Sequence, residues 1–343
     1  MLSKNDEAHE NSAAFFNPQT KCCSYVPTIP NFLVGRILED QDPSQAAGRA
    51  TIEDRIRAGV AVTPLGLEQP QNFQVLYSLS GDTLFGQSRS LRCPHYLEDA
   101  GGRCGVWKHR ASICATWHCK YVRGLVGNEF WTTLHQLLST VEKSLARWCV
   151  LQSDVGVEAL TQLFPSRRRL RGDGAISPRA LDGLTDPSAS RKVWGHWTGR
   201  EAEFYRECAQ LVNALDWPDV VAINRGEVQL WSRLLCEAYN KLISEEVPER
   251  LKVGALQVLS MDQVSCSVNT YSPYDPISVP QELIEVLGYF DGRPTVEALE
   301  AISERESVTL DASLIRKLTD FGLLIPVQGN NCDSIPFGIN QDD

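Results

Sequence analysis

The sequence predicts an α+β protein that is mostly helical and built from three domains. Cysteine, glycine and proline crowd the first part of the chain, amphipathic helical patterns follow, and short strand-like runs return near the C-terminus. With 343 residues, the chain exceeds the length that one hydrophobic core usually serves. We therefore expect a disordered tail (1–20), a cysteine-rich domain (21–124), a helical domain (125–248), a third domain (249–328) and a polar tail (329–343).

The composition is that of an acidic globular protein. Hydrophobic residues make up 43% of the chain and charged residues 22%, with a net charge of −10. Nucleic-acid binding depends on clustered Lys and Arg that neutralise phosphates, so a sequence pI near 5.2 argues against it. No run of 18 apolar residues and no basic-then-apolar N-terminus occurs. We expect a cytoplasmic protein that binds neither nucleic acid nor membrane, and its oligomeric state stays open.

The cysteine-rich domain has few long periodic runs. Within it, Phe32–Leu38 and Ile52–Val60 are predicted to be short helices, and Gln74–Leu79 a strand. Proline and glycine interrupt the remainder. We expect a small domain that is held together by something other than a large core.

Three amphipathic helices are predicted in the middle domain, the first beginning near Asn128. Their apolar positions recur at three- and four-residue steps: Phe130, Leu134, Leu137, Leu138, Val141, Leu145 and Trp148; Phe204, Cys208, Leu211, Val212 and Leu215; Trp231, Leu234, Leu235, Ala238, Leu242 and Ile243. Between the first two helices, residues 165–190 are predicted to form an exposed loop. Its basic run, 167–171, is either a solvated charge run or a grip for an anion.

The third domain alternates short strands and short helices. Strands are predicted at Leu251–Val258, Val264–Thr270 and Leu323–Val327, and helices at Gln281–Phe290, 296–303 and 311–321. A turn is expected at 291–294, Thr295 is expected to cap the second helix, and Asp311 begins the third. Three short helices with terminal strands form a winged-helix-like pattern.

Six cysteines gather in the first 119 residues: Cys22, Cys23, Cys93, Cys104, Cys114 and Cys119. In a reducing compartment they are not expected to form a disulfide framework. Thiolates are soft ligands that suit zinc and iron–sulfur clusters, and such a centre stabilises a domain that has little core. We predict a metal ion or cluster held by these thiols. The alternative is reduced structural or redox-sensing thiols.

The remaining cysteines and the nearby histidines carry weaker signals. Cys149, Cys208, Cys236, Cys266 and Cys332 are expected to be small apolar residues without chemistry. His95, His109 and His118 lie among the clustered thiols, and each is open as an extra ligand, as a hydrogen-bond donor to a ligand, or as a packing residue.

The run CPHYLEDAGGRCGVWKHRASICATWHC, with the upstream Cys22-Cys23 pair, resembles the zinc- or iron-chelating cysteine-cluster family of the CxxCxxCC type. The matching positions are Cys93-Pro94, Leu97, Cys104, Val106-Trp107, Arg110 and Cys114. The chain departs from the family pattern where no CxxC precedes the cysteine pair and where Ala111 stands for proline. Flagellin lysine N-methylases carry a similar cluster as a [4Fe–4S] centre. The resemblance implies an iron–sulfur cluster or iron as cofactor, with zinc as the alternative.

Residues 272–324 are similar to the winged-helix modules that hold leader peptides in pathways that modify ribosomally made peptides, of the pyrroloquinoline-quinone chaperone kind. The matching pieces are Phe290-Asp291-Gly292, Thr295-Val296 and Leu318–Leu324. From Pro280 to Val327 the net charge is −5. A winged helix that binds DNA needs the opposite sign, so a peptide or protein partner, added as a strand to a sheet edge, is favoured.

Together these features predict a metal- or iron–sulfur-cluster-binding protein. We expect a metalloenzyme or accessory factor acting on a peptide or protein that residues 249–328 present. The alternative is a non-catalytic interaction protein with a structural zinc site. Because the chain contains no G-x-S-x-G, GxxxxGK or GxGxxG motif, the sequence assigns no catalytic residue.

Overall fold

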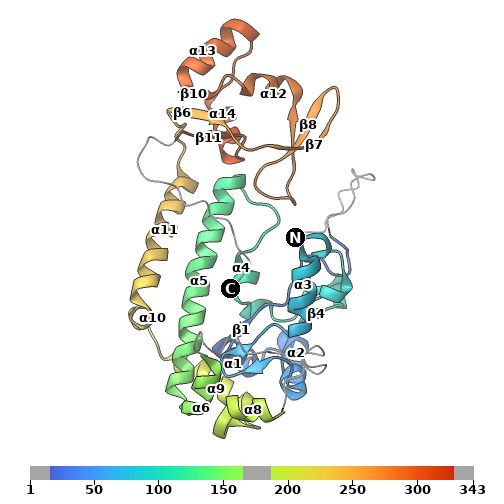
Figure 1. Ribbon diagram of the computed structural model, residues 1–343, viewed down its shortest axis with the longest axis vertical. Helices are drawn as coiled ribbons and strands as arrows, with labels where there is room; N and C mark the ends of the chain where they lie inside the picture. Colours follow the sequence, from blue (N-terminus) through green and yellow to red (C-terminus); the bar gives the residue numbers. More distant parts are fainter. Residues whose placement is uncertain (1–15, 165–186, 328–343) are drawn as a thin grey trace. The chain divides into compact units, whose positions relative to one another are not determined.

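The computed structural model describes residues 16–164 and 187–327 (Figure 1). The described part is mostly helical with small sheets, which confirms the coarse fold class. It divides into two compact units, of which the first comprises Met1–Trp117 and Thr133–Leu234, and the second His118–Thr132 and Leu235–Asp343. The division falls within the two longest of the described helices, α5 (Gly124–Gln152) and α11 (Arg225–Ile243).

Several predicted segments lie wholly or partly outside the described residues. The polar tail 329–343 and the basic run 167–171 lie outside them entirely. Of the predicted tail 1–20, residues 16–20 are described, and the hydroxyl of the buried Thr20 donates to the Gly86 carbonyl over 2.8 Å. Of the predicted loop 165–190, the last four residues begin helix α8 (Pro187–Trp194).

The first unit combines helices with very short strands. Its other α-helices are α1 (Asn31–Glu39), α2 (Ala46–Ala58), α3 (Gln71–Leu84), α4 (Ser112–Thr116), α6 (Val157–Leu163), α9 (Glu201–Asn213) and α10 (Trp217–Ile223). Its strands are β1 (Ile29–Pro30), β2 (Val62–Thr63) and β3 (Gly66–Leu67), in the antiparallel order β1-β3-β2, and the antiparallel pair β4 (Tyr96–Leu97) and β5 (Arg103–Cys104). Its 3-10 turns are η1 (Pro43–Gln45), η2 (Arg89–Leu91), η3 (Asp99–Gly101), η4 (Trp107–His109) and η6 (Gly195–Trp197).

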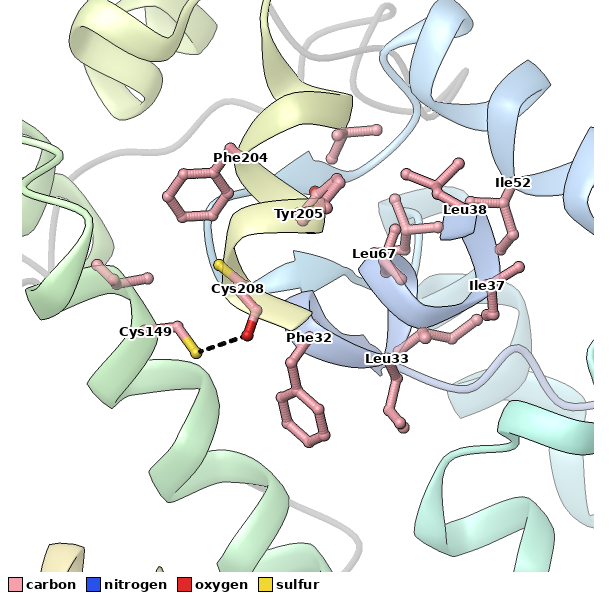
Figure 2. Close-up of a cluster of buried hydrophobic side chains, with 14 of the residues drawn as sticks. Phe32, Leu33, Ile37, Leu38, Ile52, Leu67, Cys149, Phe204, Tyr205 and Cys208 are labelled. Atoms are coloured by element: carbon pink, nitrogen blue, oxygen red, sulfur yellow. Dashed lines mark hydrogen bonds between the residues drawn. The ribbon is translucent and has the colours of Figure 1, made fainter. Parts of the chain in front are cut away.

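The main core of the first unit is built around the contact of α1 with α9 (Figure 2). Helix α1 is buried nearly all round, because its apolar residues stand on more than one face. Gly35 permits the approach, since a Cβ atom there would lie 1.9 Å from the carbonyl oxygen of Tyr205. Cys149 and Cys208 are buried in this core, as predicted, and the Cys149 thiol donates to the Cys208 carbonyl over 3.7 Å.

A second, small core corrects one prediction. Residues 74–79 were expected to form a strand, but they belong to helix α3. Phe73 and Tyr77 stand one helical turn apart, stack with ring centroids 5.5 Å apart, and both meet the ring of Tyr25. Spacing of i and i+4 places both rings on one face of a helix, and this packing outweighs the strand preference of the segment.

In its described residues, the second unit carries two three-stranded antiparallel sheets and three short helices. The strands are β6 (Arg250–Val253), β7 (Gln257–Met261), β8 (Ser265–Asn269), β9 (Ile277–Pro280), β10 (Asp291–Pro294) and β11 (Leu324–Pro326), in the orders β10-β6-β11 and β7-β8-β9. The helices are α12 (Gln281–Leu287), α13 (Thr295–Glu306) and α14 (Ala312–Asp320). The three predicted helices and the last strand are confirmed. Asp311 caps α14 as expected, because its Oδ1 accepts from the Leu314 amide over 2.7 Å.

Three local predictions in this unit are wrong. The segment 251–258 contains two strands, because Gly254 leaves the sheet and donates its amide to the Leu323 carbonyl over 2.8 Å. The expected turn at 291–294 is strand β10, which pairs with the central strand β6. Thr295 does not cap α13, since its hydroxyl donates to the Pro248 carbonyl over 2.7 Å.

Arg123 ties three segments of the second unit together. Its guanidinium pairs with the Asp320 carboxylate, with N···O distances of 2.8 and 2.5 Å. Its remaining nitrogen donates to carbonyls at the end of α11, including that of Ser244 at 3.0 Å. Because the pair is largely shielded from water, each partner depends on the other for solvation.

We predict that Gly35→Ala lowers the free energy of unfolding by about 1–3 kcal/mol, because the new methyl group forces α1 away from the α9 backbone. Gly226→Ala in α11 is the matched control, since a Cβ atom there meets nothing within 4 Å. The control is expected to leave stability unchanged or to raise it by up to about 1 kcal/mol. Urea denaturation of the two variants measures the difference, and equal midpoints would contradict the close approach.

Candidate functional site

Five of the six predicted thiols occur together in the first unit, and three separate segments supply them. Cys22 and Cys23 follow a turn in which the Lys21 amide donates to the Asn17 carbonyl over 2.8 Å. The amide of Cys93 donates to the carbonyl of Cys23 over 2.8 Å, which joins the second segment to the first. The third segment carries the other two thiols, Cys104 on β5 and Cys114 in α4.

The loop that carries the second and third segments rests directly on helix α2. A Cβ atom on Gly48 of α2 would lie 1.7 Å from the Gly105 carbonyl oxygen, so only glycine fits this contact. The Gly105 amide in turn donates to the His95 carbonyl over 2.8 Å. The next turns of α2 therefore face this loop, and they bring Thr51 and Arg55 to it.

The thiols interact electrostatically with one another. Cys23 donates its S–H to the sulfur of Cys22, which lowers the pKa of Cys22 to about 7 and raises that of Cys23 well above its usual range. Burial raises the pKa of Cys93 to about 12. Burial raises the pKa of Cys114 strongly too, with smaller contributions from the charges of Cys93 and Cys104. Without a compensating cation, the five thiols cannot all ionise near neutral pH.

A buried arginine supplies positive charge beside this cluster. The Arg55 side chain is only 6% exposed, and its Nε donates to the Val60 carbonyl over 3.0 Å. Its Nη2 donates to the Glu68 carbonyl, while Nη1 is buried without a hydrogen-bond partner. Burial lowers the pKa of Arg55 to about 10, and the charge of Cys93 is the largest influence that opposes this shift. Among the described residues, no carboxylate forms an ion pair with Arg55.

His95 follows Cys93 by two residues and is fully buried. Its ring nitrogen Nδ1 is 2.8 Å from the hydroxyl of Thr51, and Nε2 is buried with no hydrogen-bond partner. Burial, reinforced by the charge of Arg55, lowers the pKa of His95 to about 3. The imidazole is therefore neutral at physiological pH, the form in which histidine binds metals.

The other two candidate histidines are engaged elsewhere. His109 Nε2 lies 2.8 Å from the carboxylate of Asp40, which also pairs with Lys108 at 2.8 Å. The hydrogen bonds from Lys108 and His109 hold the pKa of Asp40 well below its usual range. In the second unit, the His118 ring packs edge-on against Trp131, with centroids 4.7 Å apart.

Cys119, the sixth predicted ligand, is buried in the second unit, where its carbonyl accepts from the Ser272 hydroxyl over 3.3 Å. Of the cysteines expected to be simple packing residues, Cys266 is buried in β8 as predicted. Cys236 lies on helix α11 and is exposed, so it does not pack in a core. Cys332 lies outside the described residues.

The donor set fits a soft metal ion or an iron–sulfur cluster by its chemistry. It offers five thiols, together with a neutral imidazole nitrogen that has no partner. In the arrangement described for 16–164 and 187–327, no group of three or more His, Cys, Asp or Glu could hold a metal ion. Binding therefore requires the sulfurs to rearrange toward one another.

A second surface of interest lies on the β7-β8-β9 sheet of the second unit. Strand β7 is at its edge, and every residue of this strand is exposed. Val258, Leu259 and Met261 are 55%, 52% and 60% exposed. An exposed edge strand with apolar side chains can pair with a further strand supplied by another chain.

No protein-family model, curated protein or solved structure matches this chain. The resemblance carried by the cysteine run therefore stays a prediction. Among the helices that the structure describes, none combines the length and the apolar character needed to cross a membrane.

Sequence reasoning found the thiols but missed the residues that surround them. Gly48, Thr51 and Arg55 lie on one helix more than 35 residues before His95, and no motif links them to the cysteines. Positions 48, 51 and 55 follow helical spacing, so the sequence places these three residues on one face of a helix. This spacing indicates that the three residues share a neighbour but does not identify it.

We predict that Cys22 of the metal-free protein reacts with iodoacetamide half-maximally near pH 7, and faster as the pH rises, because the thiolate is the nucleophile. Cys93, whose pKa is about 12, is expected to react only at much higher pH. Cys23→Ala removes the S–H donor and shifts the Cys22 midpoint toward about 8.5. Mass spectrometry of labelled peptides over a pH series measures both rates. Equal pH profiles for Cys22 in the two proteins would refute the hydrogen bond.

Proposed function

We propose that this protein holds a metal ion or an iron–sulfur cluster through Cys22, Cys23, Cys93, Cys104 and Cys114. The main support is that these thiols lie close enough to influence one another's pKa values. They come from three segments that are separated by about 70 and about 10 residues in sequence. Cys119 remains a predicted sixth ligand. A cytoplasmic location, where free thiols persist, is part of the proposal.

Electrostatics supports a cation at this place. Without one, the most deeply buried thiols, Cys93 and Cys114, stay protonated, because thiolates repel one another and are poorly solvated. A bound cation reverses this balance, since a coordinated thiol loses its proton outright. Arg55 then no longer stands as an isolated buried charge, because the thiolate of Cys93 offsets it.

The chain's own residues have definite roles in this proposal. The cysteines would hold the group, and the Gly48–Gly105 contact would fix the loop that carries them. When bound, an iron–sulfur cluster would supply one-electron chemistry or a Lewis-acidic iron, whereas zinc would supply Lewis acidity or structural support. The resemblance to the cysteine-cluster family favours the cluster.

We further propose that residues 249–328 present a peptide or protein to this centre, as a metalloenzyme or accessory factor requires. The exposed apolar edge of β7 supports an extended partner that adds as a strand. The charge of −5 between Pro280 and Val327 favours a partner with Lys or Arg and disfavours DNA.

A structural zinc site in a non-catalytic interaction protein is the second candidate. The small core of Val26, Phe73 and Leu91 favours it, because so few buried residues leave this part of the unit dependent on another source of stability. In that case zinc would be coordinated on all sides and leave no open position.

We predict that the wild-type protein, purified without oxygen, contains stoichiometric iron with acid-labile sulfide, or zinc. Substitution of a residue that hydrogen-bonds to a metal ligand typically weakens metal affinity by about 10- to 100-fold. Cys104→Ser removes a ligand itself and is therefore expected to weaken metal retention by more than this. Cys236→Ser is the matched control, because this cysteine is exposed on α11 and is expected to leave the metal content unchanged.

Metal analysis with an absorption spectrum separates the candidates. Iron with sulfide supports the cluster, and zinc without sulfide supports the structural site. A folded wild type that holds neither metal, with all five thiols titratable, overturns the proposed function.

We predict that phage-displayed peptides selected on the whole protein are extended sequences with Lys or Arg. Leu259→Lys, which places a charge on the β7 edge, is expected to weaken their binding by about 5- to 30-fold. Val296→Lys on α13 is the control, because Val296 is also exposed but does not lie on the edge strand. Equal affinity of the two variants, measured by calorimetry, would exclude β7 as the binding edge.

A further inference from the structure

The ring of His95 is held by one nitrogen and leaves the other without a partner. Its side chain has no exposed surface, and Nε2 forms no hydrogen bond among the described residues. A buried polar atom in this state is costly, because it has lost its hydrogen bonds to water, and native proteins seldom tolerate it. The atom therefore calls for a ligand or a bound water.

The hydrogen bonds of Thr51 determine which ring nitrogen carries the proton. The Thr51 hydroxyl donates its single hydrogen to the Gly48 carbonyl over 2.6 Å. It can therefore only accept from the His95 ring, 2.8 Å away, so Nδ1 carries the hydrogen. Nε2 is then left with a free lone pair, which faces no donor among the described side chains. A metal-binding histidine is held in the same way, with one nitrogen donating to an oxygen and the other coordinating the ion.

His95 is also tied by its backbone to two of the proposed ligands. Its amide donates to the sulfur of Cys93, two residues earlier. Its carbonyl accepts from the Gly105 amide, next to Cys104, and strand β4 pairs with β5 so that Tyr96 faces Cys104. The same backbone segment therefore positions the His95 imidazole and the sulfurs of Cys93 and Cys104.

We propose that His95 is a nitrogen ligand of the metal centre, bound through Nε2, and that Thr51 is the residue that positions its ring. This inference rests on the proposed function. It makes the centre a mixed sulfur and nitrogen site. His109 is not proposed, since its Nε2 already meets Asp40, and His118 is not proposed, since its ring packs against Trp131.

The competing explanation is a buried water molecule. Arg55 Nη1 is also buried without a partner, and Arg55 influences the His95 ring electrostatically. A water between Nη1 and Nε2 would satisfy both atoms and would leave His95 outside the centre. The two explanations differ in whether nitrogen is bound to the metal.

The test is spectroscopy of the wild-type protein as purified, so it needs no substitution. For bound zinc, X-ray absorption is expected to show a nitrogen neighbour at about 2.0–2.1 Å beside sulfur at about 2.3 Å. For an iron–sulfur cluster, pulsed electron paramagnetic resonance of the reduced state is expected to show nitrogen coupling that changes when histidine is labelled with ¹⁵N.

Three substitutions and a control sharpen the result. His95→Gln is expected to abolish the nitrogen signal, and His95→Cys to replace it with sulfur while retaining metal. His135→Gln is the matched control and is expected to change nothing, because His135 Nδ1 is likewise buried without a partner, but His135 stands on helix α5 and not on a cysteine-bearing segment. Thr51→Val, which removes the positioning hydroxyl, is expected to weaken metal affinity by about 10- to 100-fold while keeping the nitrogen signal.

The outcomes separate the two proposals. Bound metal with sulfur neighbours alone, or a nitrogen signal that persists in His95→Gln, overturns the role of His95 and leaves the proposed function standing. A wild type that binds neither iron nor zinc overturns both.

Discussion

A backbone contact between helix α2 and the cysteine-bearing loop is the constraint on which the candidate centre depends. Gly48 and Gly105 meet so closely that no side chain fits between them. Helix α2 thereby presents Thr51 and Arg55 to the segment that runs from Cys93 to Cys104. The thiols themselves are carried on short strands and turns, so their placement relies on this contact and on the Cys93–Cys23 backbone hydrogen bond.

Charge balance then connects the parts of this region. Arg55 is a buried cation without a carboxylate partner among the described residues, and burial keeps the nearby thiol of Cys93 protonated. The buried charge of Arg55 is unfavourable alone, and it is balanced when a bound cation converts the thiols into thiolates. Asp40, Lys108 and His109 form a separate, self-balanced group that anchors the same loop to the end of α1.

Local patterns predicted the helices whose apolar positions recur regularly along the chain. The apolar steps around Leu137, Phe204 and Leu234 correctly indicated α5, α9 and α11. Prediction failed where distant partners decide: Tyr25 makes 74–79 helical, and β6 draws 291–294 into a sheet. For the site, cysteine density identified the thiols, but Thr51 and Arg55 could not be predicted because only the folded chain brings α2 to them.

The exposed edge of β7 has a consequence for the behaviour of the protein in solution. Val258, Leu259 and Met261 stand on a strand whose outer backbone groups can pair with an identical strand of another molecule. Mutual repulsion at a net charge of −10 opposes such self-association near neutral pH. That repulsion vanishes as the pH approaches 5.2, so precipitation in mildly acidic buffer should begin at this strand.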